Sequence, residues 1–241
     1  MSTDLFDLTE QEQADLDRAL AAMAAGQFDF VDAGTSKGGS LVLCQKRFQC
    51  GPGIGFDSDP EKIALARKAG HHVYRCDLLE TPLPENSVSF GSMLDFLEHL
   101  PDEAMAKQFL VNIARASRDF LVVRHPSFED IEYLADFDLK IGWTHWSGHK
   151  NMMTVADFER VFADLGWTEY AIKPRRQILS SEDPAVVPIH APINAVHYND
   201  EVHGPKNSVA FDRPVYTGFD IFVALRPFEP REWRKLTAKL L

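Results

Sequence analysis

Three aspartates in the first third of the chain, Asp32, Asp57 and Asp77, each follow a short strand-like segment. A turn with glycines at Gly34 and Gly38 follows the first of them and opens a predicted helix. A carboxylate can accept hydrogen bonds from paired hydroxyl groups such as those of a ribose. The N-terminus of a helix adds free N–H groups and partial positive charge. These residues together predict a binding site for a nucleotide-sized ligand.

A second group of reactive side chains lies in Trp143 to Asn151, which holds two tryptophans and two histidines around a glycine. Apolar walls with a few polar groups are typical of small-molecule pockets. Histidine can accept a proton at neutral pH, so His145 and His149 are candidate catalytic bases. Hydrogen bonding within the loop is the alternative role for both. His125, which directly follows a predicted strand, is a third candidate base.

No metal site is predicted. His145 and His149 have the spacing of zinc ligands on a helix, but Ser147 and Gly148 disfavour a helix there. No glutamate follows the first histidine, as it does in the helical zinc motif. The three cysteines of the chain also lack the spacing of a zinc site or a disulfide framework.

The elements that must position these side chains alternate along the chain. Strand-like apolar runs are expected at 28–31, 53–57, 72–75, 88–94, 119–124, 168–173 and 219–225. Cap residues such as Asp59 and Thr154, and helix-ending glycines such as Gly70 and Gly166, indicate helices between them. The alternation predicts a single α/β domain with a mostly parallel sheet. All three aspartates would then lie at the carboxyl edge of that sheet.

The order of these motifs resembles the class I S-adenosylmethionine-dependent methyltransferases over residues 28–176. The sequence DAGTSKG at 32–38 matches the first motif of that family, with Ser36 in place of its middle glycine. FLEHLPD at 96–102 is similar to the segment that ends the family's fourth strand. Ser89 departs from the pattern, because an acid is usual at the start of that strand.

The resemblance implies a Rossmann-like α/β/α sandwich with a seven-stranded, mostly parallel sheet, whose antiparallel last strand is inserted between the fifth and sixth. It implies S-adenosyl-L-methionine as the cofactor, with the ribose on Asp57 and the adenine beside Asp77 and Leu78. Asp95 and Glu98 are candidate partners of the sulfonium and amino groups. The predicted cofactor-binding residues are Asp32, Gly34, Ser36, Gly38, Asp57, Ser58, Asp77, Leu78 and Asp95.

The composition bears on partners and location. With 25 Lys+Arg against 36 Asp+Glu, the net charge is −11, which disfavours nucleic-acid partners. The acidic, polar N-terminus argues against a secretory signal, and no apolar run is long enough to span a bilayer. We therefore expect a cytoplasmic protein without integral membrane association. The expected acceptor is a small molecule or a glycan-type compound, methylated on oxygen or nitrogen.

The chain is expected to form a single methyltransferase domain, 1–241, that starts with an N-terminal helical segment, 1–27. Residues 177–217 are rich in Pro, Asn, Asp and His and show no helical periodicity. A loop of this length is usually functional or disordered, and it contains several aromatic residues that are unusual in a solvated linker. It is predicted to be a lid or substrate-binding insertion before the last strand, with an inert mobile loop as the alternative.

Two other functions remain open from the residues. An NAD(P)-dependent oxidoreductase would share the strand, the glycine turn and the acid at Asp57, but would not explain Asp77-Leu78 or the 96–102 segment. A non-catalytic cofactor-binding or scaffold domain of the same fold would be consistent with Ser36 and Ser89.

Overall fold

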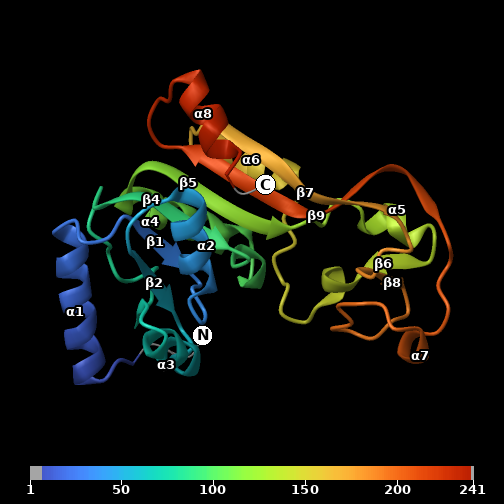
Figure 1. The fold of residues 1–241 in the computed structure, drawn as a ribbon, viewed down its shortest axis with the longest axis horizontal. Coiled ribbons are helices and arrows are strands. Elements are labelled where there is room, and N and C mark those ends of the chain that lie inside the picture. The colour runs from blue at the N-terminus through green and yellow to red at the C-terminus, as the bar shows by residue number, and fades with distance from the viewer. Residues whose placement is uncertain (1–6, 240–241) are drawn as a thin grey trace.

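The computed structural model describes residues 7–239 (Figure 1). The predicted segment 1–27 and the predicted domain 1–241 therefore extend in part outside the described residues.

The helices are α1 (Glu10–Ala24), α2 (Gly39–Phe48), α3 (Pro60–Lys68), α4 (Glu103–Ala116), α5 (Ile131–Ala135), α6 (Val155–Asp164), α7 (Asp200–His203), α8 (Pro230–Thr237) and the short 3-10 helices η2 (Leu97–His99) and η3 (Gly142–His145). The strands are β1 (Phe30–Ala33), β2 (Gly53–Asp57), β3 (His72–Arg75), β4 (Val88–Leu94), β5 (Ser117–Pro126), β6 (Leu139–Ile141), β7 (Tyr170–Ser180), β8 (Val186–Pro188) and β9 (Ala210–Ala224). Across the described range, no helix combines the length and the apolar character needed to cross a membrane.

Within residues 7–239, seven of the strands form one sheet in the order β3-β2-β1-β4-β5-β9-β7. Strands β1 to β5 pair in parallel, whereas β9 runs antiparallel to both of its neighbours, β5 and β7. The predicted Rossmann-like fold is confirmed, including the antiparallel last strand between the fifth and sixth strands of the sheet. This order differs from the all-parallel sheet, with strand order 3-2-1-4-5-6, of dinucleotide-binding enzymes.

Helices cover both faces of the sheet, and each buries an apolar stripe (Figure 1). Helices α1, α4 and α6 pack on one face, and α2, α3 and α8 pack on the other. On the second face, the rings of Phe30, Phe90 and Phe120 stack across three neighbouring strands, with centroids 4.9 and 4.8 Å apart. Phe48 of α2 closes on this stack at 4.8 Å from Phe90.

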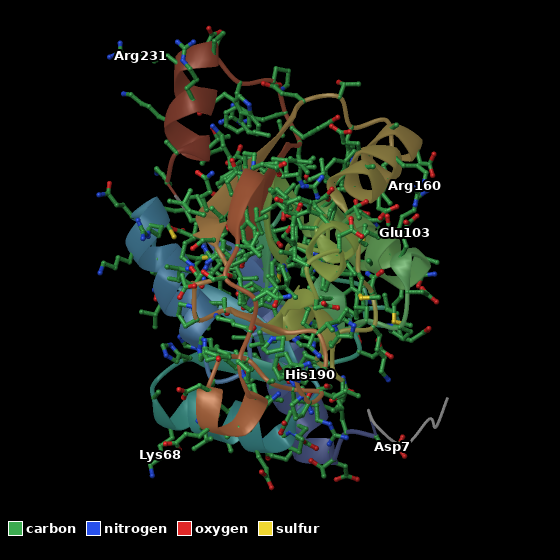
Figure 2. All side chains as sticks on the ribbon, turned by 90° about the vertical axis from the view of Figure 1, so that its right-hand side faces the viewer. Asp7, Lys68, Glu103, Arg160, His190 and Arg231 are labelled. Carbon is green, nitrogen blue, oxygen red and sulfur yellow. The ribbon has the colours of Figure 1, made fainter. Side chains whose placement is uncertain are left out.

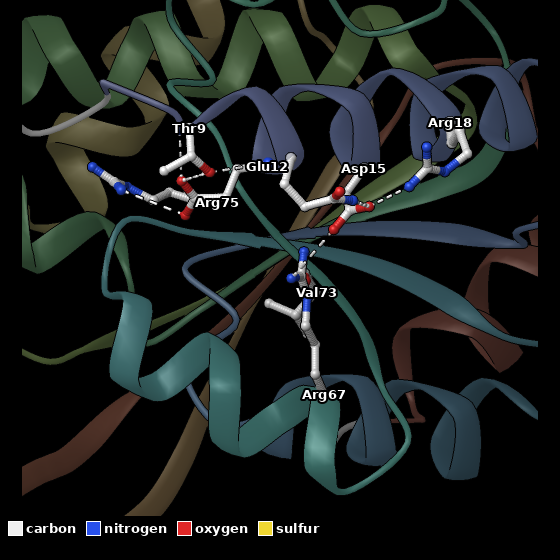
Figure 3. A network of polar contacts seen from close by, with 8 residues as sticks. Thr9, Glu12, Asp15, Arg18, Arg67, Val73 and Arg75 are labelled. Carbon is white, nitrogen blue, oxygen red and sulfur yellow. Dashed lines mark hydrogen bonds and ion pairs between the residues drawn. The ribbon is translucent and has the colours of Figure 1, made fainter.

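Helix α1 docks beside β3 through both charged and apolar contacts (Figure 3). Thr9 and Glu12 form a capping box, and Glu12 also reaches Arg75 at 3.5 Å. Asp15 pairs with Arg67 of α3 at 3.9 Å. Solvent-exposed ion pairs contribute only about 0–1 kcal/mol each. Most of the docking energy therefore comes from the buried stripe of Leu16, Ala19 and Met23.

Helices α4 and α6, which pack on the same face of the sheet as α1, are joined at the protein surface. Figure 2 shows Arg160 of α6 beside Glu103 of α4, with which it forms an ion pair. Arg160 also pairs with Asp157 at 2.9 Å, and Asp157 forms a capping box with Thr154 at the start of α6. These contacts fix where α6 begins, and hence the path of the chain that leads into it from the predicted acceptor segment.

A side lobe, residues 131–150 and 178–216, projects beyond the end of the main sheet (Figure 1). In it, β6 pairs antiparallel with β8. Its apolar core consists of Leu134, Leu139, Ile141, Ile178, Ala185, Val186 and Val215. Strands β7 and β9 run from the main sheet into this core, so the lobe is built on the extension of two sheet strands.

Residues 177–217 contain more regular structure than the irregular loop expected from their composition. Strand β7 continues to Ser180 and β9 begins at Ala210, while β8 and α7 lie between them. Strands β7 and β9 remain paired from Tyr170 with Val223 to Ser180 with Ala210, with one irregularity after Ile178. The sequence 210–217 contains a proline and charged residues, so its composition does not indicate the first part of β9. Proline is normally confined to edges and irregularities of a sheet.

The aromatic stack predicts a large stability effect. Phe90→Ala should lower the free energy of unfolding by about 3–5 kcal/mol, because it leaves a cavity between Phe30 and Phe120. Urea unfolding followed by circular dichroism measures the change. The control is Leu65→Ala on α3. Leu65 is 50% exposed, so this substitution should change the free energy of unfolding by less than about 1 kcal/mol. A loss below about 1 kcal/mol for Phe90→Ala would contradict the importance of the stack.

Candidate active site

The turn between β1 and α2 requires glycine at two positions. Gly34 and Gly38 have φ of 73° and 93°, in the left-handed region that side chains rarely adopt. A Cβ atom at Gly34 would lie 2.3 Å from the ring of Phe96, and one at Gly38 would lie 2.3 Å from the ring of His71. The tight path therefore brings the backbone of the turn close to the segments after β4 and β3.

Ser36 occupies the position at which the resembling family has the middle glycine of its motif. Its φ is 52°, so it adopts the left-handed conformation without being glycine. Its backbone N–H donates to Asp57 Oδ2 at 2.7 Å, and the N–H of Asp59 donates to Asp57 Oδ1 at 2.9 Å. Each carboxylate oxygen keeps a second lone pair for a ligand hydroxyl. Ser58, which follows Asp57 in the chain, is exposed.

Asp32 lies beneath the turn and is 0% exposed. Its two oxygens accept hydrogen bonds from the Ser40 hydroxyl at 2.5 Å and the Ser92 hydroxyl at 2.6 Å. Burial raises the pKa of Asp32 to about 6, because the charged form loses its hydration. The structure therefore places Asp32 where it joins β1, α2 and β4 rather than on the open surface of the turn.

The other predicted cofactor residues follow β3 and β4 at the same edge. Asp77 is half-buried, and its Oδ1 accepts the Leu79 N–H at 2.9 Å, while Leu78 is buried. Asp95 is the first residue after β4, is exposed and has φ of 53°. Its N–H donates to the carbonyl of Arg124 on β5 at 3.0 Å. The carboxyl ends of β1 to β4 thus bring all the predicted cofactor residues to one edge.

The three candidate bases occupy different environments. His125 is 0% exposed and packs between Phe128 and Phe158. Its Nδ1 lies 2.9 Å from the Pro126 carbonyl, and burial lowers its pKa to about 4. His145 is exposed, with its Nδ1 3.2 Å from the Thr144 hydroxyl. Neither of these two imidazoles lies in the side-chain cluster formed after β4.

His149 lies in that cluster, together with His99 and Glu98 of η2. One potential ligand atom from each of the three lies within 4.8 Å of the others. Glu98 is 1% exposed, and burial raises its pKa to about 8. The N–H groups of Lys150 and Asn151 both donate to the Glu98 carbonyl, at 2.9 and 3.1 Å. These bonds fix the predicted acceptor segment to the chain that follows β4.

Sequence reasoning did not foresee two of these arrangements. The serines that bond Asp32 come from α2 and β4, and only the folded sheet brings them together. Likewise, His149 lies fifty residues after His99 in the chain, so their proximity carries no local sequence signal. The adjacent Glu98-His99 pair after a strand was the available signal for the cluster.

A comparison with known protein families bears on this fold. Residues 31–119 match the family model described as a methyltransferase domain. Residues 31–119 therefore carry a methyltransferase domain. The expected enzyme class, a methyltransferase, is confirmed for this domain, and S-adenosyl-L-methionine stays its predicted cofactor. The matched range of the methyltransferase domain runs from β1 into β5 and so includes the turn, Asp57, Asp77 and η2. A search of curated proteins finds no match to this methyltransferase.

Solved structures share the fold of this methyltransferase. They include an S-adenosylmethionine-dependent methyltransferase of Archaeoglobus fulgidus, 17% identical with a TM-score of 0.57, covering 91% of this chain and 96% of that one. The YcgJ protein of Bacillus subtilis is 13% identical with a TM-score of 0.55, covering 90% and 100%. A Thermotoga maritima methyltransferase, described as a possible histamine N-methyltransferase, is 14% identical with a TM-score of 0.51, covering 90% and 95%. At these identities the likeness concerns the fold alone.

The buried carboxyl of Asp32 predicts a pH-dependent stability. As pH falls through about 6 the folded protein binds a proton at Asp32, whereas the unfolded chain does so only near 3.8. Folding is therefore stabilised by this group as pH falls, by about 2 kcal/mol between pH 7.5 and 4.5. Asp32→Asn should remove that increment, as measured by urea unfolding at both pH values.

The other titrating groups are the same in Asp32→Asn and in the unmodified protein. Their contributions therefore cancel when the pH dependence of one protein is subtracted from that of the other. Asp164→Asn, an exposed change on α6, should leave the pH dependence unaltered. The same pH dependence in Asp32→Asn and the unmodified protein would rule out a raised pKa at Asp32.

Proposed function

We propose that this methyltransferase transfers the methyl group of S-adenosyl-L-methionine to an oxygen or nitrogen of a small-molecule or glycan-type acceptor. The observation that carries the proposal is the attachment of residues 143–151 to the carbonyl of Glu98. The attachment supports the proposal because Trp146 and His149 contact His99, in the short helix that follows β4.

The cofactor side of the proposal rests on the tight turn and the strand-end acids. Asp57 would accept hydrogen bonds from the ribose hydroxyls, since its oxygens have lone pairs left after bonding Ser36 and Asp59. Asp77 and Leu78 would face the adenine, and Asp95 the sulfonium or amino group. Without a Cβ at Gly34 and Gly38, the backbone can follow the close path that such a ligand needs.

The chemistry asked of the protein is alignment and proton removal. Bound S-adenosylmethionine supplies a methyl group on a cationic sulfur. The residues after η3 would hold the acceptor atom in line with that methyl group. In a displacement of this kind, such alignment makes a larger contribution to the rate than proton removal. A hydroxyl or amine acceptor must also lose a proton. We assign this step to the cluster of His149, His99 and Glu98 rather than to buried His125 or to His145.

Two features support this function over the alternatives. The antiparallel strand between β5 and β7 differs from the all-parallel sheet of dinucleotide-binding enzymes, which disfavours an oxidoreductase. The net charge of −11 favours small acceptors over nucleic acids, because nucleic-acid affinity depends on neutralising phosphates.

Cofactor binding provides the first test. Asp57→Ala should weaken S-adenosylmethionine binding by about 100-fold, because two hydrogen bonds to a charged acceptor are lost at about 1.5 kcal/mol each. Isothermal titration calorimetry measures the affinity. Glu61→Ala, an exposed change on the first turn of α3, should bind within a factor of about two of the unmodified protein. Tighter binding of NAD(P) than of S-adenosylmethionine would overturn the proposal, and binding of neither would indicate a scaffold.

The predicted insertion, 177–217, is proposed to act as a lid or substrate-binding element within the single domain. Ser180 and Ala210 are paired across β7 and β9, so a two-residue Asn-Gly turn can replace 181–209. This shortened protein should keep its S-adenosylmethionine affinity within about threefold and lose methyl transfer. Transfer of a labelled methyl group to metabolite fractions identifies an active acceptor and measures turnover. Unchanged turnover in the shortened protein would refute the lid.

A further inference from the structure

The cluster of Glu98, His99 and His149 gathers three potential metal ligands from two distant segments. One ligand atom of each lies within 4.8 Å of the other two. The backbone is fixed on both sides, because Lys150 and Asn151 donate to the Glu98 carbonyl. The side chains are thus brought together by main-chain hydrogen bonds that exist independently of any bond among the three.

Both imidazoles are held in one tautomer. Nδ1 of His99 lies 3.1 Å from the carbonyl of Gly148, and Nδ1 of His149 lies 2.9 Å from the carbonyl of Trp143. A carbonyl only accepts, so each Nδ1 carries the proton and each Nε2 presents a lone pair. Backbone carbonyls on the second nitrogen are a common support for histidines that bind metals.

The third member of the cluster has an unsatisfied acceptor. Glu98 is 1% exposed, and its Oε2 is buried without a hydrogen-bond partner. A buried polar atom without a partner costs free energy, and few such atoms occur in folded proteins. A carboxylate oxygen without a hydrogen-bond partner among the described residues therefore lies in the same cluster as the two imidazoles.

Aromatic rings hold the two histidines in place. Trp146 makes edge contacts with the rings of His99 and His149, with centroids 5.8 and 4.9 Å apart. Phe128 makes a further edge contact with His149 at 6.0 Å. These contacts restrict the orientations of the two imidazole rings.

We propose that Glu98, His99 and His149 bind a divalent transition-metal ion that also binds the acceptor. Two histidines and one carboxylate are a ligand set of catalytic zinc sites, in which a further position stays open. Tetrahedral zinc needs ligand atoms about 3.3 Å apart. The three atoms lie within 4.8 Å of one another, so the exposed imidazole of His99 would move toward the other two on binding. The inference rests on the proposed methyl transfer and concerns how its acceptor is activated.

The metal would change how the acceptor loses its proton. An acceptor hydroxyl that coordinates through oxygen becomes more acidic, as metal-bound water does. Its O–H bond then breaks and the proton passes to water. The oxygen electron pair forms the new C–O bond as the methyl–sulfur bond breaks, which leaves S-adenosylhomocysteine and the methylated acceptor. His149 then serves as a ligand instead of as the base.

Metal binding can be measured without knowing the acceptor. The chelator-treated full-length protein is titrated with Co²⁺, whose visible absorption reports the ligand geometry, and with Zn²⁺ by calorimetry. We expect about one ion per chain. Glu98→Gln and His149→Ala should each weaken binding by at least about 100-fold, because even the loss of a residue that supports a ligand costs 10–100-fold.

The matched control is His197→Ala, which removes an exposed histidine of the side lobe outside the cluster. It should leave Co²⁺ and Zn²⁺ affinity unchanged. His99→Ala, at an exposed position, provides a third ligand variant that should fold and should also lose binding. Absence of a Co²⁺ spectrum in the unmodified protein, or equal affinity in Glu98→Gln and the His197→Ala control, would overturn the proposal.

Failure of the metal site and failure of the proposed function give different results. S-adenosylmethionine titration of the chelator-treated protein tests the cofactor site alone, because that site uses Asp57 and the turn. Cofactor binding without metal binding refutes only the metal. No cofactor binding, with or without metal, refutes the methyltransferase function. Loss of labelled methyl transfer in chelator, restored by Zn²⁺ or Co²⁺, supports both.

Discussion

The parallel register of β1, β2 and β4 is the constraint on which this protein depends. It places the turn after β1 between the carboxyl ends of its two neighbours. The Ser36 N–H then reaches the Asp57 carboxylate at the end of β2, and Asp32 reaches the Ser92 hydroxyl of β4. One turn is thereby joined to three strands, and this connection fixes the turn at the carboxyl edge of the sheet.

Sequence alone could predict the parts of the site that follow from local patterns. The strand-end positions of Asp57 and Asp77, the glycine turn and the antiparallel last strand were all accessible from short motifs and the family they resemble. The side lobe was not, because its strands β6 and β8 are three residues each and pair across a long stretch of chain. The convergence of His149 with Glu98 depends on that lobe, so no local pattern could reveal it.

Burial shifts the pKa of several titratable groups at this edge toward the neutral form of each group. Burial raises the pKa of Asp32 to about 6 and that of Glu98 to about 8, and it lowers that of His125 to about 4. Such shifts concentrate at functional sites, because folding elsewhere has little reason to retain groups that are costly to bury. In this protein they surround the ends of β1, β4 and β5, while the helical layers bury mainly apolar side chains.

Strand β9 belongs to both apolar cores of the molecule at once. Its later part, from Gly218, pairs with β5 in the main sheet, whereas Val215 lies in the core of the side lobe. Because one continuous strand takes part in both, packing in the side lobe and packing in the main sheet are mechanically coupled through the β7–β9 ribbon.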